Sequence, residues 1–281
     1  MRFAVVAHQQ SETNRRLVAA GWPGACAALL TPREALLKLE PGDVALVRLD
    51  VAPDLDGVEE GLWIAGRLEA HGIKILNRPS ALLAAHDKLV TARLLSGAGI
   101  PHPHTRRLSL GLPPADLEYP LVAKPRFGSW GRDVELCADA AALERYLART
   151  ASRTWWRAGA IAQALVRPQP TDLRLVVAGG RVVGAAVRTA APGEWRTNVA
   201  LGGRSDPTVP TPEACVLGVA AATALGLDLA GVDLLHLSTG VPIVIEVNGS
   251  VDFKPHYALG EDVFDAAATA LAATLPSRVA A

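Results

Sequence analysis

Residues 231–248 read GVDLLHLSTGVPIVIEVN, two runs of strand-forming residues on either side of Thr239-Gly240. Two short apolar runs around such a pair predict an antiparallel β-hairpin. With these two residues at the tip, Asp233 lies directly opposite Glu246, and Asn248 shares their face because side chains alternate along a strand. Opposed like charges destabilise a sheet, so the hairpin needs a partner for its two acids.

The acids and Asn248 form a candidate metal site. The same face is expected to carry Leu235, Leu237 and Val244, and the other face Val232, Leu234, Ile243, Ile245 and Val247. With apolar side chains on both faces, two carboxylates meet in a half-buried place where neither is stable as an anion. Two carboxylates and an amide oxygen are donors suited to Mg²⁺ or Mn²⁺. We therefore expect Asp233, Glu246 and Asn248 to bind the metal; a solvated polar face is the alternative.

The composition limits what kind of protein this is. Of the 281 residues, 50% are hydrophobic and 20% are charged, with 28 basic and 28 acidic side chains. The mean hydropathy is +0.22 and the pI is about 7.1. Such a chain forms a sizeable core, which excludes disorder. Its balanced charge gives no general attraction for nucleic acid or an acidic membrane, so we expect neither as a partner.

No segment predicts a membrane span or an export signal. The longest stretch without a charged side chain, at 17–32, is broken by glycines and a proline and is too short for a bilayer. The apolar run at the N-terminus is too short for a signal peptide. Cys26, Cys137 and Cys215 are widely spaced, as is typical of reduced thiols. We expect a cytoplasmic protein.

The order of segments predicts an α/β chain of more than one unit. Up to residue 80, strand-like runs at 3–7, 25–30, 44–49 and 73–76 alternate with amphipathic segments, which favours βαβ units and a parallel sheet. Thr31-Pro32-Arg33-Glu34 has the cap, the first-turn proline and the reciprocal acid of a helix start. A proline-rich link at 99–104 then marks a boundary.

A glycine loop follows a lysine at the end of the next predicted strand. The segment at 122–132 reads VAKPRFGSWGR, with Lys124 ahead of Gly128 and Gly131. The lysine charge and the flexible backbone N–H groups suit an oligophosphate. A glycine turn beside a surface lysine is equally typical of an ordinary hairpin.

Two arginines flank another predicted hairpin, whose turn is Gly179-Gly180. In a register without bulges, Arg174 lies opposite Ala185 and Arg188 opposite Thr171. We expect both arginines on one face, an expectation that depends on this register. Guanidinium groups bind carboxylates in a bidentate manner, although arginines on a solvated face are common.

Read in order, these segments resemble the RimK-type ATP-grasp ligases, and among them most closely the LysX-like amino-acid ligases that act on carrier proteins. The stretches that carry the resemblance are NRP at 77–79, DK at 87–88, AKP at 123–125, GSWGR at 128–132, QALV at 163–166, DLR at 172–174, WRTN at 195–198, GVDL at 231–234 and EVN at 246–248. The resemblance implies an ATP-grasp fold, with a parallel-sheet subdomain at 1–86, a lid subdomain at 87–166 and a metal-binding subdomain at 167–281.

The resemblance also implies roles for individual residues. The positions that would bind ATP are Lys88, Lys124, Ser129, Gln163, Ala164, Leu165, Asp172, Arg196 and Asn198. The two lysines would contact phosphates, and the main chain after Gln163 would hold adenine. Asp172 would lie on the ribose side, and Arg196 and Asn198 near the phosphates and the metal. Arg174 and Arg188 are the expected catalytic residues, and Asp233, Glu246 and Asn248 match the magnesium ligands of the family.

The implied activity is an ADP-forming ligase that joins an amino acid to a carboxylate through an acyl phosphate. We expect glutamate or a homologue as the amine, with its carboxylates facing Arg174 and Arg188. The acceptor stays open between a carrier protein, a pterin, furan or deazaflavin cofactor tail, and a protein C-terminus. The segment at 249–254, which contains the candidate substrate residue Ser250, differs from the family pattern. A homo-oligomer is compatible with the family, and a non-catalytic ATP-binding module is the alternative of another class.

Overall fold

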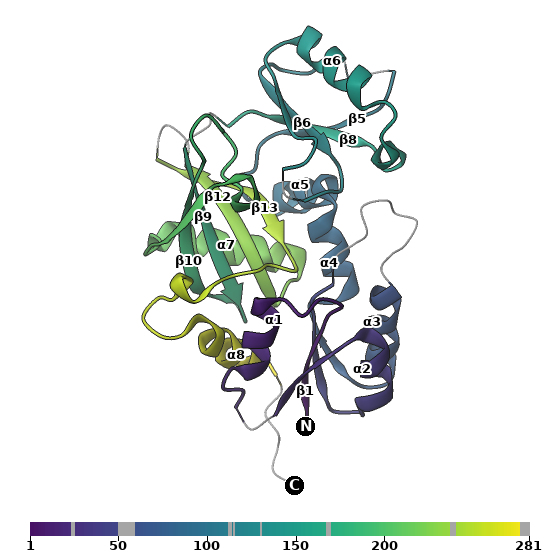
Figure 1. Cartoon of the computed structure of the whole chain (residues 1–281), viewed down its shortest axis with the longest axis vertical. Coiled ribbons are helices and arrows are strands. Elements are labelled where there is room, and N and C mark those ends of the chain that lie inside the picture. The colour runs from purple at the N-terminus through teal and green to yellow at the C-terminus, as the bar shows by residue number, and fades with distance from the viewer. Residues whose placement is uncertain are drawn as a thin grey trace.

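The structure is a computed structural model that describes residues 1–23, 26–49, 60–111, 114, 116–129, 131–166, 170–236 and 240–275. Three sheets organise these residues (Figure 1). The first has the order β2-β1-β3-β4, and every pairing in it is parallel, as the alternating pattern predicts. Its strands are β1 (Phe3–Val6), β2 (Ala27–Leu30), β3 (Val44–Val47) and β4 (Lys74–Leu76). Its helices are α1 (Glu12–Ala19), α2 (Pro32–Lys38) and α3 (Glu60–Ala70).

Local sequence explains where α2 starts. Thr31 accepts a hydrogen bond from the Glu34 amide, and the Glu34 side chain accepts one from the Thr31 amide. This reciprocal cap, with Pro32 in the first turn, confirms the predicted helix start.

The second sheet is antiparallel, with the order β5-β8-β6-β7. Its strands are β5 (Thr105–Leu108), β6 (Leu121–Pro125), β7 (Glu135–Cys137) and β8 (Ala160–Ala164). One helix, α6 (Ala140–Thr150), covers a face of this sheet and buries Leu143 and Tyr146 in its small core. In Figure 1 this unit lies at the far end from the first sheet.

The third sheet has the order β11-β10-β9-β12-β13 and is also antiparallel. Its strands are β9 (Thr171–Ala178), β10 (Arg181–Thr189), β11 (Arg204–Pro207), β12 (Leu229–His236) and β13 (Pro242–Asn248). Helix α7 (Pro212–Leu225) belongs to the core that contains Leu175, and α8 (Val263–Ala273) to the core that contains Val176. Because adjacent strand residues point to opposite faces, the two helices cover opposite faces of the sheet.

Helices α4 (Pro79–His86) and α5 (Lys88–Gly97) lead from the first sheet to the second. Just before α4, Asn77 is fully buried with φ +55°, a left-handed conformation that asparagine tolerates better than most residues. Its amide donates to the carbonyls of Leu229 and Gly249, and its carbonyl accepts from the backbone amides of Asp228 and Leu229. Asn77 thus links the first sheet to the third.

The registers of the two hairpins differ from the bulge-free prediction. Asp233 does lie opposite Glu246, but the register then shifts so that Leu234 faces Val244, which leaves Ile245 as the extra residue of a bulge. The predicted face assignments of Ile243, Val244 and Ile245 are therefore wrong. Val244 packs with Leu234 in the core, while Ile245 turns to the face of the acids.

A second bulge corrects the arginine hairpin. The register shifts between Val182 and Gly184, so Arg188 lies opposite Asp172 and Arg174 opposite Ala186. The partners predicted for a straight ladder, Thr171 and Ala185, are wrong by one residue. The bulge puts Arg174 and Arg188 on the same face, which confirms the expectation of a shared face.

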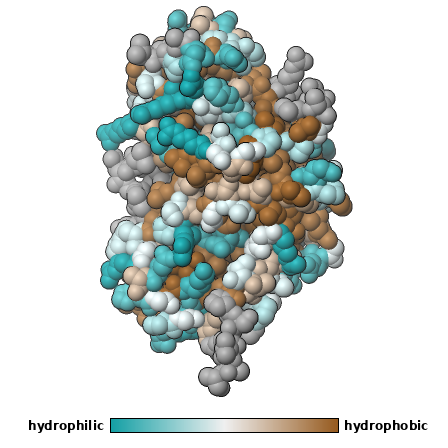
Figure 2. Space-filling view, turned by 180° about the vertical axis from the view of Figure 1, so that it is seen from behind, coloured by the Kyte–Doolittle hydropathy of each residue, from teal (hydrophilic) through white to brown (hydrophobic). Residues whose placement is uncertain are grey.

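Each sheet falls within one of the three predicted subdomain ranges; the boundaries themselves stay a prediction. Among the described residues, no helix is both long and apolar enough to cross a bilayer. Figure 2 shows the molecule from behind the view of Figure 1. Apolar residues gather across the middle of this side.

Candidate active site

A cavity between the second and third sheets brings together all nine residues assigned to ATP. They are Lys88, Lys124, Ser129, Gln163, Ala164, Leu165, Asp172, Arg196 and Asn198. They come from the start of α5, the strands β6, β8 and β9, and the segments that follow β6, β8 and β10. Asp233 and Glu246, from β12 and β13, also line the cavity, so its lining contains both acids and cations.

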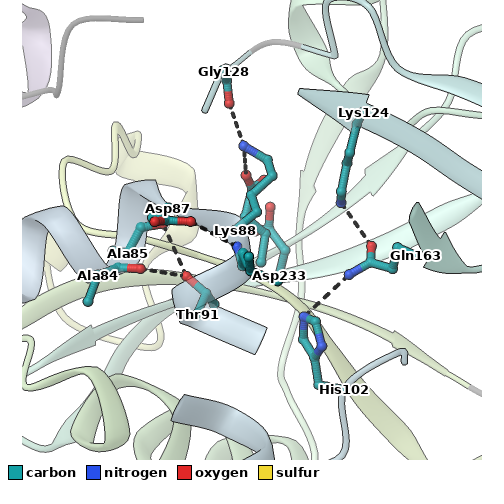
Figure 3. A network of polar contacts seen from close by, with 12 residues as sticks. Ala84, Ala85, Asp87, Lys88, Thr91, His102, Lys124, Gly128, Gln163 and Asp233 are labelled. Atoms are coloured by element: carbon teal, nitrogen blue, oxygen red, sulfur yellow. Dashed lines mark hydrogen bonds and ion pairs between the residues drawn. The ribbon is translucent and has the colours of Figure 1, made fainter. Parts of the chain in front are cut away.

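The two lysines enter the cavity from different elements. Lys88 is the first residue of α5, and its Nζ donates to the Gly128 carbonyl at 2.6 Å and lies 3.5 Å from Glu246 Oε1. Lys124 on β6 is 8% exposed, and its Nζ donates to Gln163 Oε1 at 2.8 Å (Figure 3). Burial lowers the pKa of Lys124 to about 8, with Glu246 opposing and Lys88 assisting that change.

Local contacts hold Lys88 at the cavity. Asp87 caps α5 by accepting from the amides of Leu89 and Val90. The same carboxylate pairs with the guanidinium of Arg126, and the Lys88 amide donates to the Arg126 carbonyl. The start of α5 is therefore tied to the end of β6, ahead of the glycine loop.

A buried charge network occupies the sheet face below the cavity. Arg174 makes a bidentate contact with Asp233, with Nε–Oδ1 and Nη2–Oδ2 distances of 2.7 and 2.6 Å. Arg188 binds Asp172 in the same way at 2.7 and 2.5 Å, and its Nη2 also donates to Asp233 Oδ2 at 2.9 Å. Burial raises the pKa of Asp233, but the charges of Arg174 and Arg188 outweigh it and lower the pKa to about 2.

These partners were not foreseen from the sequence. The predicted ribose residue, Asp172, binds Arg188 and accepts from the Thr197 hydroxyl. Arg196 pairs with Glu194 and donates to the Gly131 carbonyl at 2.8 Å, so its guanidinium braces the glycine loop. The sequence assigned no role to Thr197, although it lies between Arg196 and Asn198. Its hydrogen bond to Asp172 depends on the loop after β10 packing against β9.

The hairpin residues fit a divalent cation. Asp233 and Glu246 lie opposite each other in the register. The side-chain amide of Asn248 is buried, and its Nδ2 has no hydrogen-bond partner among the described residues. Among the described residues, Asp233 Oδ1 accepts one hydrogen bond, from Arg174, which leaves a lone pair of this oxygen for a cation. Within the described part of the chain, no cluster of three His, Cys, Asp or Glu side chains offers another site.

A second cavity adjoins the first. It shares Lys88, Gly128, Ser129, Arg188, Asn198 and Glu246 with the first. Its other polar walls include Arg174, Asn248, the predicted substrate residue Ser250, and Lys254. His86 also lines it; burial and the charge of Lys88 lower the pKa of this imidazole to about 4, so it is neutral at pH 7. The shared residues lie where two ligands could meet.

Comparisons with known proteins identify a family and several relatives. The model of the RimK-like ATP-grasp domain matches residues 85–263. A probable alpha-L-glutamate ligase of Parasynechococcus marenigrum is 33% identical over 89% of this chain and 57% of its own length. A beta-citrylglutamate synthase B of Danio rerio is 30% identical over 79% of this chain and 56% of its own length. The chain therefore spans less than two thirds of the length of these curated relatives.

Solved structures share the overall arrangement. A RimK domain ATP-grasp protein from Sphaerobacter thermophilus has a TM-score of 0.67 at 23% identity, covering 96% of this chain and 99% of that chain. D-cycloserine synthetase DcsG has a TM-score of 0.72 at 19% identity, covering 97% of this chain and 99% of that chain. At these identities the likeness concerns the fold.

Proposed function

This chain belongs to the RimK-like ATP-grasp family, and from that premise we propose that it is an ATP-dependent ligase that forms an amide bond and releases ADP and phosphate. The observation that carries the proposal is the pair of adjoining cavities with Lys88, Arg188 and Glu246 on their shared border. One cavity has the residues for a nucleotide, and the other has room and polar groups for a second substrate. The reaction centre then lies where the two meet.

The proposed reaction has two steps. A carboxylate oxygen of the substrate attacks the γ-phosphorus of ATP, the bond to the β,γ-bridging oxygen breaks, and ADP leaves. The amine of the second substrate then attacks the acyl carbon, the amide C–N bond forms, and phosphate leaves with the electron pair of the acyl C–O bond. The amine loses a proton to solvent or to phosphate. Catalysis of such a transfer depends mainly on positioning and on charge stabilisation.

The residues of the first cavity would hold the nucleotide. We assign the phosphates to Lys88 and Lys124, because both side chains line the cavity from different elements and the charge of Glu246 acts on both ammonium groups. Asp233, Glu246 and Asn248 would hold Mg²⁺ or Mn²⁺, which when bound neutralises negative charge on the phosphates. The backbone after Gln163, at Ala164 and Leu165, would hold adenine.

Arg174 and Arg188 are assigned to the border between the two substrates. Each guanidinium uses Nε and Nη2 for a buried carboxylate, which fixes its plane. The cavities both reach Arg188, and the second reaches Arg174. A fixed guanidinium at this place can bind a carboxylate of glutamate or the oxygens of the acyl phosphate.

We propose glutamate or a close homologue as the amine substrate, since relatives are named glutamate ligase or citrylglutamate synthase. The acceptor is a carboxylate carried by a small molecule, a cofactor tail or a protein. The cavity that contains Ser250 and Lys254 is where this choice would be made.

Product analysis tests the proposal. The protein is incubated with ATP, Mg²⁺, glutamate and a fractionated set of carboxylate acceptors, and nucleotides are separated by chromatography. ADP and phosphate in equal amounts, dependent on acceptor and glutamate, are expected. AMP and pyrophosphate would contradict the acyl-phosphate route, and binding of ATP without turnover for any acceptor would favour a non-catalytic module. Lys124→Met is the matched control that lacks a phosphate contact.

A further inference from the structure

The carboxamide of Gln163 stands between the nucleotide cavity and the link that precedes β5. Its Oε1 accepts from Lys124 Nζ at 2.8 Å. Its Nε2 donates to Thr105 Oγ1 at 3.1 Å and lies 3.4 Å from His102 Nε2 (Figure 3). Gln163 is only 5% exposed, so these partners replace water. Both amide hydrogens and the carbonyl oxygen are thereby used.

The partners of Gln163 permit one orientation of its amide. The Thr105 hydroxyl donates to the Pro103 carbonyl at 2.8 Å, so it offers Gln163 only lone pairs. A neutral His102 with its proton on Nδ1 likewise offers a lone pair at Nε2, and this is the tautomer that matches the Gln163 NH₂ group. Turned by 180°, the amide would point its NH₂ group at the Lys124 ammonium, donor against donor. Thr105 and His102 therefore keep Oε1 directed at Lys124.

His102 also touches the other sheet. The Pro101 carbonyl accepts from the Val244 amide of β13 at 2.9 Å, and the His104 carbonyl accepts from the Ala164 amide at 2.8 Å. The His102 ring itself hydrogen-bonds to the backbone of Ile245, the neighbour of Glu246. The link at 101–104 thus joins the second sheet to the third, with the imidazole between them.

We propose that His102 is a positioning residue for Lys124. It holds the Gln163 amide in the orientation that accepts from the Lys124 ammonium, and it does so from the link that joins the two sheets around the nucleotide. The burial of the ring and the charge of Lys124 lower the pKa of His102 to about 4, so the ring stays neutral and can accept a hydrogen bond throughout the neutral pH range. The inference rests on the proposed function in one respect, that the ligand of the cavity is ATP.

Direct binding of ATP, measured by calorimetry on the whole chain, tests this role. His102→Leu removes the acceptor, and we expect the Kd for ATP to rise about two- to tenfold, the range for one net hydrogen bond. His102→Gln, which can present an oxygen, should restore binding to near the wild-type Kd. The control is His104→Leu, because the His104 side chain is exposed and two residues away; its Kd should not change.

A double-mutant cycle separates positioning from packing. In a Gln163→Leu background the amide is gone, so His102→Leu should change the Kd no further. An equal fold-change in both backgrounds would mean that His102 acts through packing alone and would overturn the proposal. So would an unchanged Kd in His102→Leu.

Two further results keep the test decisive. If His102→Leu does not fold, Thr105→Val removes the other acceptor at Gln163 Nε2 and must raise the Kd in the same range; no rise overturns the proposal. If the wild-type chain does not bind ATP, the proposed function itself fails. Binding of ATP with no effect of either substitution overturns only the inference about His102.

Discussion

Replacing Lys124 by methionine should make the unliganded protein more stable while removing its affinity for ATP. Lys124 is a charged group in a buried place, and burial lowers its pKa from 10.5 to about 8, despite the attraction of Glu246. At about 1.36 kcal/mol for each pKa unit, this costs the folded state roughly 3 kcal/mol at pH 7. Methionine has a similar length and no charge, so it relieves that cost.

The expected gain is smaller than the full electrostatic cost. Lys124→Met also removes the hydrogen bond to Gln163 Oε1, worth about 1 kcal/mol. We therefore expect the free energy of unfolding at pH 7 to rise by about 2 kcal/mol. The exposed Lys74 of β4 provides the matched control, because Lys74→Met should change stability by less than about 0.5 kcal/mol.

The pH dependence identifies the cause. Between pH 8 and pH 10.5 the unfolded lysine still binds a proton that the folded one has lost, so wild-type stability rises with pH across this window. The advantage of Lys124→Met should therefore shrink as the pH rises through it. Urea unfolding at pH 7, 8, 9 and 10 measures this. A variant less stable than wild type at pH 7, or an advantage independent of pH, would refute the reasoning.

Three further predictions concern the metal site, Arg174, and Asn77, which connects the first sheet to the third. Glu246→Gln should weaken Mg²⁺ binding and lower turnover by orders of magnitude; a loss of twofold or less, about 0.4 kcal/mol, would reject Glu246 as a ligand. Arg174→Lys cannot keep both contacts to Asp233. A higher KM for glutamate with unchanged kcat would then assign Arg174 to substrate binding, whereas a lower kcat at unchanged KM would assign it to phosphoryl transfer. Asn77→Ala should lower the free energy of unfolding by about 3 kcal/mol, because it leaves buried backbone groups of β12 without partners; chemical denaturation measures this, and a loss below about 1 kcal/mol would contradict it.

Local features of the fold could be predicted because their causes are local. The cap of α2 depends on four consecutive residues. The parallel first sheet follows from alternation of strands and helices, which leaves few other arrangements. Asp233 and Glu246 do pair as predicted, although the residues nearer the turn are displaced by one from the predicted register, because the bulge at Ile245 compensates for that displacement.

The bulges could not be predicted in the same way. A bulge at Val183 leaves the Gly179-Gly180 turn in place and breaks no alternation that the sequence displays, but it shifts every residue beyond it by one. In the other hairpin the bulge at Ile245 separates the expected pair, Asp233 and Glu246, from turn-side residues that are displaced by one. The partner of Arg188 followed from the shift at Val183, which is why Thr171 was expected and Asp172 was found.

The sequence by itself determined the family, the chemical nature of the candidate site and the face that Asp233 and Glu246 share, because motifs and strand periodicity are properties of short segments. Only the tertiary structure decided which charges meet. Arg174 and Arg188 bind buried aspartates, and Gln163 stands between Lys124 and His102. Such contacts join residues far apart in the chain. A buried polar group has lost its water, so its hydrogen-bond partner is the polar group that packing places beside it.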